Sequence, residues 1–190
     1  MLKTNSDVCY EIYKKAKPFI KNFNNAIDVG CRDGDFTKHI IKDFSMCYSY
    51  DYRPRGPMYT LLNNNGLKIK YFNVGLSDKA EKVTAWGGVI TDHRNDSNIS
   101  KRKTVDLSTL DSYNITDVGL IKIDVEGHEL KVIKGGLETI NICQPVIIIE
   151  QNNQVEKFNK GLQYDALNFL KTLDYDVVDK YQNDFILKKK

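Results

Sequence analysis

An α/β fold with a mostly parallel sheet covered by helices is predicted by three features of the sequence. Strand-like and helix-like segments alternate along the chain, as they do when helices connect parallel strands. Residues 146–149 are four consecutive aliphatics, a run typical of a central strand that is buried on both faces. The chain ends in two strand-like segments, 176–180 and 184–187, separated by a short turn, which predicts a terminal antiparallel hairpin.

The first half of the chain continues this alternation. Residues 6–20 predict an amphipathic helix, because Val8, Ile12, Ala16 and Phe19 share one helical face. Further helices are expected over residues 35–44 and 54–62, the second with Pro57 in its first turn at most. The strands expected in this half are 26–30, 46–51 and 69–74.

The second half adds a pair of short strands, 82–86 and 103–107, around a polar loop rich in Gly, Asp and Asn. A loop as long as 87–101 is usually a lid, a binding loop or a disordered segment. Trp86 and His93 make it a candidate for binding a carbohydrate acceptor. The remaining elements are strands at 120–124 and 145–150 and helices at 127–140 and, with an interruption near Gly161, 154–173.

Length and composition fit one globular domain over residues 1–190, with residues 1–23 as an N-terminal helical extension. The 190 residues are 41% hydrophobic, enough for a proper core. No apolar run approaches the roughly 20 residues that span a bilayer, and the N-terminus lacks the apolar region of a signal peptide. We therefore expect a cytoplasmic protein that does not bind membranes. The four cysteines match no zinc-site spacing.

The net charge of +3 is weak, and most basic residues are scattered. A nucleic-acid-binding protein would show a basic stripe on one face. Nucleic acid is therefore not the expected partner, and a small-molecule or carbohydrate acceptor fits better. The short chain leaves no separate acceptor domain, so loops or a second subunit of a homo-oligomer would have to form the acceptor pocket.

A glycine-containing turn follows the strand at 26–30. Asp28, Gly30 and Gly34 form the pattern D-x-G-x-x-x-G, whereas a dinucleotide fingerprint would need further glycines at positions 32 and 35. No phosphate-binding P-loop is present either. Such a turn suits a cofactor with an amino-acid tail and a nucleoside but no pyrophosphate. The alternative is a strand-to-helix turn with a capping acid.

Asp51 ends the next strand, about twenty residues after the turn. An acid at this position can bind the two hydroxyls of a ribose, as it does in dinucleotide folds. The alternative is a surface aspartate that precedes a loop. Together with the glycine turn, Asp51 points to an adenosine ligand.

Several further motifs occur in a recognisable order. After the glycine turn and Asp51 come Gly75-Leu76-Ser77-Asp78, Thr109-Leu110-Asp111, Ile121-Lys122-Ile123-Asp124-Val125-Glu126-Gly127-His128-Glu129, Lys134-Gly135-Gly136 and Pro145-Val146-Ile147-Ile148-Ile149-Glu150. With these motifs, residues 24–180 resemble the FkbM-type family of S-adenosylmethionine-dependent methyltransferases. The resemblance implies a Rossmann-like sheet of seven strands, mostly parallel with an antiparallel last strand and helices on both faces. It also implies methyl transfer, usually to a hydroxyl of a sugar or natural product.

The resemblance also implies the cofactor site. It assigns S-adenosylmethionine to Asp28, Gly30, Gly34 and Asp51, with Ser77 and Asp78 as contacts on the adenine side. The chain departs from the family pattern at residues 31–33, where Cys-Arg-Asp replaces the usual small residues, and at Tyr52, which replaces a proline.

The motif around residue 124 carries the candidate catalytic residues. Asp124 ends a strand, where it can face the cofactor or act as a base, and Glu126 and His128 can orient the acceptor. The alternatives are a solvent-facing His128 and a Glu129 that only stabilises a helix N-terminus. A Mg²⁺ or Mn²⁺ site formed with Glu150 is a further alternative.

Two other functions remain open from the sequence. One is a module that binds S-adenosylmethionine without catalysis, and the other is a nucleic-acid methyltransferase. The weak basic charge and the absence of an aromatic nucleobase motif argue against the second of these.

Overall fold

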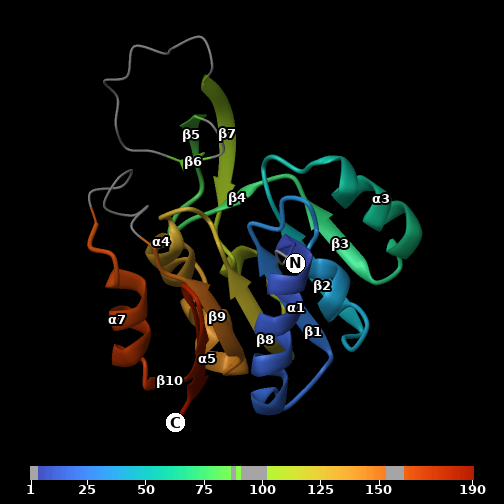
Figure 1. The fold of residues 1–190 in the computed structure, drawn as a ribbon. Coiled ribbons are helices and arrows are strands. Elements are labelled where there is room, and N and C mark those ends of the chain that lie inside the picture. The colour runs from blue at the N-terminus through green and yellow to red at the C-terminus, as the bar shows by residue number, and fades with distance from the viewer. Residues whose placement is uncertain (1–3, 87–88, 91–101, 153–160) are drawn as a thin grey trace.

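A seven-stranded sheet forms the centre of the molecule (Figure 1). The computed structural model describes residues 4–86, 89–90, 102–152 and 161–190. In the order in which they lie in the sheet, the strands are β10 (Tyr175–Tyr181), β11 (Asp184–Lys189), β9 (Val146–Glu150), β8 (Val118–Ile123), β1 (Asn25–Val29), β2 (Met46–Tyr50) and β3 (Ile69–Phe72). The last five run parallel, and β11 is antiparallel to both β9 and β10. The fold predicted from the sequence is therefore confirmed.

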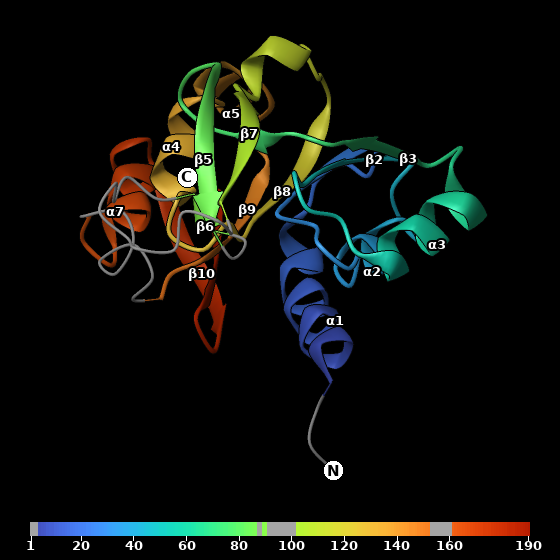
Figure 2. The same ribbon diagram turned by 90° about the horizontal axis from the view of Figure 1, so that it is seen from above.

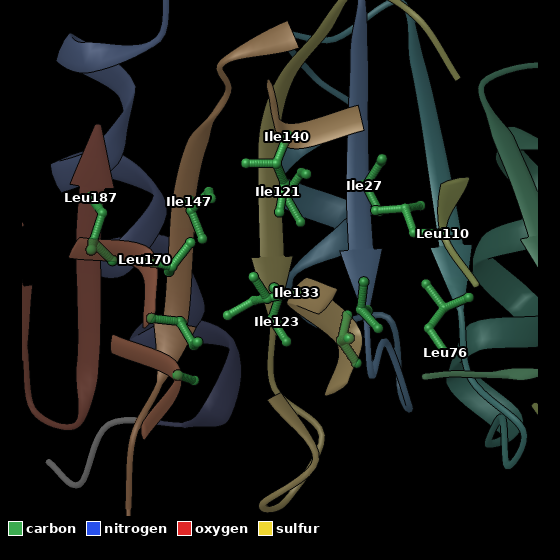
Figure 3. Packing of buried hydrophobic residues seen from close by; sticks show 14 of the residues in the cluster. Ile27, Leu76, Leu110, Ile121, Ile123, Ile133, Ile140, Ile147, Leu170 and Leu187 are labelled. Carbon is green, nitrogen blue, oxygen red and sulfur yellow. The ribbon is translucent and has the colours of Figure 1, made fainter. Parts of the chain in front are cut away.

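Helices cover both faces of this sheet (Figures 1 and 2). On one face lie α1 (Asn5–Ala16), the 3₁₀ helix η1 (Lys17–Phe19), α2 (Thr37–Ile40) and α3 (Gly56–Asn65). On the other lie η3 (Asp111–Tyr113), α4 (Glu129–Lys134), α5 (Leu137–Cys143) and α7 (Asp165–Thr172). Figure 3 shows the core beneath the second set, where Ile121 and Ile147 of the strands pack near Ile133, Ile140 and Leu170 of the helices.

On the α1 face, polar side chains replace apolar ones toward the carboxyl ends of the strands. Asp28 lies in register with Ser49 on one side and with Lys122 on the other. Glu150 lies in register with Asp184 of β11. Alternate residues of a strand share a face, so these polar side chains lie on the same face of five strands, with Glu150 two residues beyond Ile148, the register partner of Lys122. We call them the polar row: Ser49, Asp28, Lys122, Glu150 and Asp184.

A smaller second sheet has the order β4-β7-β5-β6 and lies beyond the carboxyl edge of the main sheet (Figure 1). Its strands are β4 (Gly75–Leu76), β5 (Glu81–Trp86), β6 (Val89–Ile90) and β7 (Arg102–Ser108). The antiparallel pairing of β5 with β7 confirms the two extra strands expected from the sequence. Residues 91–101, with the candidate acceptor-binding His93, lie outside the described part of the chain.

Two predicted helices differ from the observed ones. The single helix expected over 127–140 is divided into α4 and α5 at Gly135 and Gly136. Glycine is needed at position 135, because a Cβ there would lie 1.9 Å from the carbonyl oxygen of Ser77. Two consecutive glycines also disfavour a continuous helix. The helix expected over 35–44 is regular only in α2, and turns make up the rest.

The C-terminal helix is observed as α7, the last part of the predicted 154–173 segment, of which 153–160 lie outside the described residues. Among the helices that the structure describes, none is both long and apolar enough to cross a membrane.

Candidate active site

A cavity of about 390 Å³ lies at the carboxyl ends of β1, β2, β8 and β9, beneath the N-terminal half of α1. This volume falls within the range of small-molecule sites. One end is bounded by the glycine turn and by Asp51, Tyr52, Val74, Leu76 and Ile90. The other end is bounded by Lys122, Asp124, Glu126, Glu150, Gln182 and Asp184, and α1 contributes Asn5, Val8, Cys9 and Ile12.

The glycine turn is shaped by two backbone conformations that favour glycine. Gly30 has a φ of +85°, and a Cβ there would lie 1.8 Å from the carbonyl oxygen of Asp124. Gly34 has a φ of +79°, and a Cβ there would lie 2.8 Å from the sulfur of Met58. Gly30 lines the cavity, whereas Gly34 closes the turn from behind by donating its N–H to the carbonyl of Cys31.

Asp28 presents an unsatisfied acceptor at the cavity. Its side chain is fully buried, and Oδ2 accepts a hydrogen bond from the Thr37 hydroxyl at 2.6 Å. Oδ1 is also buried and has no hydrogen-bond partner among the described residues. Burial raises the pKa of Asp28, while the nearby Lys122 ammonium opposes the rise. A buried carboxylate oxygen without a partner is costly, so the ammonium of an amino-acid tail fits it well.

Asp51 organises the loop that follows the turn. Its carboxylate accepts hydrogen bonds from the backbone N–H groups of Arg32 at 2.9 Å and Arg53 at 2.6 Å. An ionised carboxylate offers about four acceptor sites, so two ribose hydroxyls can still bind. The residues therefore fit both the tail and the nucleoside of the expected cofactor.

The departure from the family pattern at residues 31–33 does not close the cavity. Arg32 adopts a φ of +37°, and its Nε pairs with the Asp33 carboxylate at 2.9 Å. Cys31 is buried, and its N–H donates to the carbonyl of Tyr50. All three residues line the cavity and leave its volume available to a ligand.

At the other end of the cavity, the buried Lys122 forms an ion pair with Asp124, whose side chain is 35% exposed. Lys122 Nζ lies 2.7 Å from Asp124 Oδ2 and 5.7 Å from the centre of the Phe36 ring. Burial favours protonation of Asp124, but the Lys122 ammonium outweighs it and holds the pKa of Asp124 below its usual value. Burial and the charges of Asp124 and Asp184 raise the pKa of Glu150 to about 8. At neutral pH, Asp124 is therefore ionised and Glu150 is protonated.

Glu126 lies at the cavity on a strained turn. Its φ is +56°, in the left-handed region that residues other than glycine disfavour. Burial raises the pKa of its carboxyl group. The buried Glu129 supports this turn, because its Oε1 accepts hydrogen bonds from the N–H groups of Gly127 at 2.9 Å and Val125 at 3.3 Å.

His128, Ser77 and Asp78 are not among the residues that line the cavity. His128 is buried, rather than facing solvent, and its Nε2 lies 3.0 Å from the Ser77 hydroxyl. Ser77 in turn donates to Asp78 at 3.1 Å. These three residues join the turn after β8 to the segment after β4, behind the cavity.

The sequence-predicted residues thus separate into two groups. The structure brings Asp28, Gly30, Asp51, Asp124 and Glu126 together around one cavity, and leaves Gly34, Ser77, Asp78 and His128 outside its lining. No three side chains of the metal-binding types converge within the described residues, so the divalent-metal alternative has no geometric support there.

Three residues at the far end of the cavity were not considered as site residues from the sequence, Lys122, Gln182 and Asp184, and Glu150 was considered only as a metal ligand. Lys122 could have been singled out from the sequence, because it is a single charged residue within an aliphatic strand. Gln182 and Asp184 belong to the terminal hairpin, and only the pairing of β11 with β9 brings them to the site.

Known proteins share this fold. The structure of methyltransferase FkbM from Methylobacillus flagellatus has a TM-score of 0.61 and 16% identity over 87% of this chain and 43% of that one, so this chain spans less than half the length of that protein. SMU.1697c from Streptococcus mutans, solved in complex with S-adenosylhomocysteine, has a TM-score of 0.57 and 15% identity over the whole of both chains. An rRNA methylase from Streptococcus thermophilus has a TM-score of 0.56 and 11% identity over 100% and 99% of the two chains.

No curated protein sequence matches the chain significantly. The family comparison is specific. The model of the methyltransferase FkbM domain matches residues 28–177, from the aspartate of the glycine turn into β10. This match covers most of the chain and includes every residue of the turn after β8. The chain therefore belongs to the FkbM methyltransferase domain family, whose methyl donor is S-adenosylmethionine.

Proposed function

We propose that the protein transfers a methyl group from S-adenosylmethionine to a hydroxyl oxygen of a sugar or a small natural-product-like acceptor. The observation that carries the proposal is the single cavity that joins Asp28, Gly30 and Asp51 to Asp124 and Glu126. Family membership supports methyl transfer. The partly buried acids of the β8 turn support an acceptor that must lose a proton as it reacts.

The first group of residues binds and orients the cofactor in this proposal. Asp28 Oδ1 accepts a hydrogen bond from the ammonium of the methionine tail, and Asp51 accepts hydrogen bonds from the ribose hydroxyls. Gly30 lets the backbone approach closely, and Gly34 holds the turn that makes this approach possible. The cofactor supplies the activated methyl group on its sulfonium, and the protein contributes mainly by positioning and by excluding water.

The acids after β8 have different roles in this proposal. Asp124 is held ionised by Lys122, so it is a weak base but a good counter-charge for the cationic cofactor. Burial raises the pKa of Glu126, which makes this residue the better proton acceptor for the acceptor hydroxyl. His128, together with Ser77 and Asp78, supports the turn from behind and does not touch the reacting atoms.

Calorimetric titration of S-adenosylhomocysteine tests this assignment. The wild type should bind it, and Asp51→Ala should weaken the binding at least about tenfold, because hydrogen bonds to a charged group contribute about 1.5–3 kcal/mol. Asp78→Ala is the matched control, since it removes an aspartate that lies off the cavity, and its affinity should stay within about twofold of wild type.

Turnover is the second part of this test. Methyl transfer to a hydroxyl acceptor in a screen of sugars and small polyols should be lost in Glu126→Gln while S-adenosylhomocysteine binding is retained. A folded wild type that does not bind S-adenosylhomocysteine contradicts the proposal, and binding without transfer to any acceptor favours a non-catalytic module instead.

A further inference from the structure

Asp184 stands out among the residues at the far end of the cavity. It is 8% exposed, it lines the cavity, and no hydrogen bond from the described residues contributes to the pKa of its carboxyl group. It begins β11 opposite Glu150, at the end of the polar row that lies farthest from the glycine turn. Its oxygens are not among the fully buried atoms that lack a partner, so the carboxylate opens onto the cavity, where it can accept a hydrogen bond from a donor on a ligand.

The surrounding charges do not satisfy Asp184. Lys122 is the nearest cation in the polar row, and its Nζ pairs with Asp124 at 2.7 Å. Burial raises the pKa of Asp184 to about 6, so the carboxylate remains ionised at pH 7.5. Glu126 adds a further acid to the cavity wall. Arg32 also lines the cavity and its charge acts on Glu126, but its Nε pairs with Asp33 at 2.9 Å. Among the described residues, no cation is therefore paired with Asp184 itself.

We propose that three residues at the far end of the cavity, Glu150, Gln182 and Asp184, form the acceptor subsite. This subsite selects an acceptor that carries a protonated amine, with Asp184 as the counter-ion. This inference rests on the proposed function, because it assigns the acceptor of that same reaction. The acceptor class is an amino sugar or an amino alcohol, in which the amine anchors the molecule and a neighbouring hydroxyl receives the methyl group.

A protonated amine fits this end better than other ligands do. A neutral hydroxyl could donate to Asp184 but would leave its charge unpaired, whereas an ammonium supplies both the donor and the charge. A metal ion would need several converging ligands, and none of the described groups of acids or histidines provides them. An anionic acceptor would meet the carboxyl groups of Glu126 and Asp184 on the cavity wall, whereas the protonated Glu150 neither attracts nor repels it.

The experiment compares two small probes of nearly the same shape, trans-2-aminocyclohexanol and trans-cyclohexane-1,2-diol, on protein saturated with S-adenosylhomocysteine. Binding is followed by NMR titration at pH 7.5. The amine should bind at least about tenfold more tightly than the diol, as expected for a charge-assisted hydrogen bond at a buried site. This preference should fall as the pH is lowered through about 6, where Asp184 becomes protonated.

Asp184→Asn should remove the preference while its affinity for S-adenosylhomocysteine stays within about twofold of wild type, which shows that the variant is folded. Asp176→Asn is the matched control, because it removes an exposed carboxylate from the same hairpin, and it should keep the preference. Equal binding of the two probes, or no binding of the amine, to a protein that binds S-adenosylhomocysteine overturns the acceptor subsite alone. Absence of S-adenosylhomocysteine binding overturns the proposed function and this inference with it.

Discussion

Lys122 Nζ and Asp124 Oδ2 lie 2.7 Å apart at the carboxyl end of β8, two residues apart in the sequence, and the lysine side chain is only 6% exposed. The pair couples the polar row of the sheet to the turn that carries Glu126. Because the lysine is buried beside several carboxylates, its pKa is raised and it stays charged, although burial alone would favour the neutral amine. Lys122 therefore acts to lower the pKa of Asp124, Asp28 and Asp184, each of which lines the cavity.

Lys122→Met should be destabilising. The substitution keeps the length of the side chain but leaves Asp124 without its counter-ion, and because the Asp124 side chain is 35% exposed, the loss should be about 1.5–3 kcal/mol rather than the larger cost of a fully buried pair. Lys82→Met is the control, since Lys82 pairs with Asp106 on the surface and such pairs contribute about 0–1 kcal/mol. Urea unfolding of the two variants checks the difference, and equal losses would show that the buried pair is no more important than the exposed one.

Gly30→Ala should abolish cofactor binding. The added Cβ would lie 1.8 Å from the carbonyl oxygen of Asp124, and the φ of +85° is unfavourable for alanine. The β1 turn must then move away from β8, which deforms the cavity. Gly56→Ala is the control, because a Cβ there meets no atom within 4 Å. Titration of S-adenosylhomocysteine should show normal affinity in Gly56→Ala, and the same affinity in Gly30→Ala would contradict the role given to this glycine.

Much of the fold could be predicted because its strands are marked by local composition. The aliphatic run 146–149 became β9, which pairs with β8 on one side and β11 on the other, and the turn at 181–183 defined the hairpin. The division between α4 and α5 could not be predicted in the same way. It depends on the contact of Gly135 with the Ser77 carbonyl, a residue far away in the sequence.

The site was predictable where a side chain ends a strand. Asp28, Asp51 and Asp124 each end or nearly end a parallel strand, and all three line the cavity. Asp184 had no such signal, because it starts a strand, and only the antiparallel return of β11 brings it beside Glu150. The sequence did not show on which side of the turn His128 lies, and the structure places it beside Ser77, off the cavity lining.

Deprotonation of Glu129 should lower the free energy of unfolding as the pH rises from about 4.5 to about 7. Burial raises the pKa of Glu129 to about 7, although the N–H groups of Gly127 and Val125 oppose the rise. The folded state thus holds this proton more tightly than the unfolded chain, so its stabilising contribution is complete at low pH and is lost on deprotonation.

The Glu129→Gln variant tests this linkage. The amide can still accept from the Gly127 N–H but does not titrate, so the difference in unfolding free energy between variant and wild type should change by up to about 3 kcal/mol over this pH range. Glu138→Gln, at an exposed position at the start of α5, is the control and should parallel the wild type. A constant difference for Glu129→Gln across the range would rule out Glu129 as the titrating group.

His128 and Ser77 should behave as a structural pair rather than as catalytic or cofactor-binding residues. Their side chains are both buried and lie 3.0 Å apart, and neither lines the cavity. Removing either partner leaves the other buried without that hydrogen bond, so His128→Ala and Ser77→Ala should each reduce stability by about 1–3 kcal/mol. The double variant should cost less than the sum of the two, with a coupling of about 1 kcal/mol in a double-mutant cycle.

The exposed pair Ser108 and Ser112, whose hydroxyls lie 3.1 Å apart, provides the control cycle and should show coupling close to zero. In all of the His128 and Ser77 variants, affinity for S-adenosylhomocysteine should stay within about twofold of wild type, because the cavity lining is unchanged. If His128→Ala loses cofactor binding or methyl transfer without losing stability, then the histidine acts in the reaction itself. His128 would then belong with the residues that take part in the reaction, and not with those that support the turn after β8.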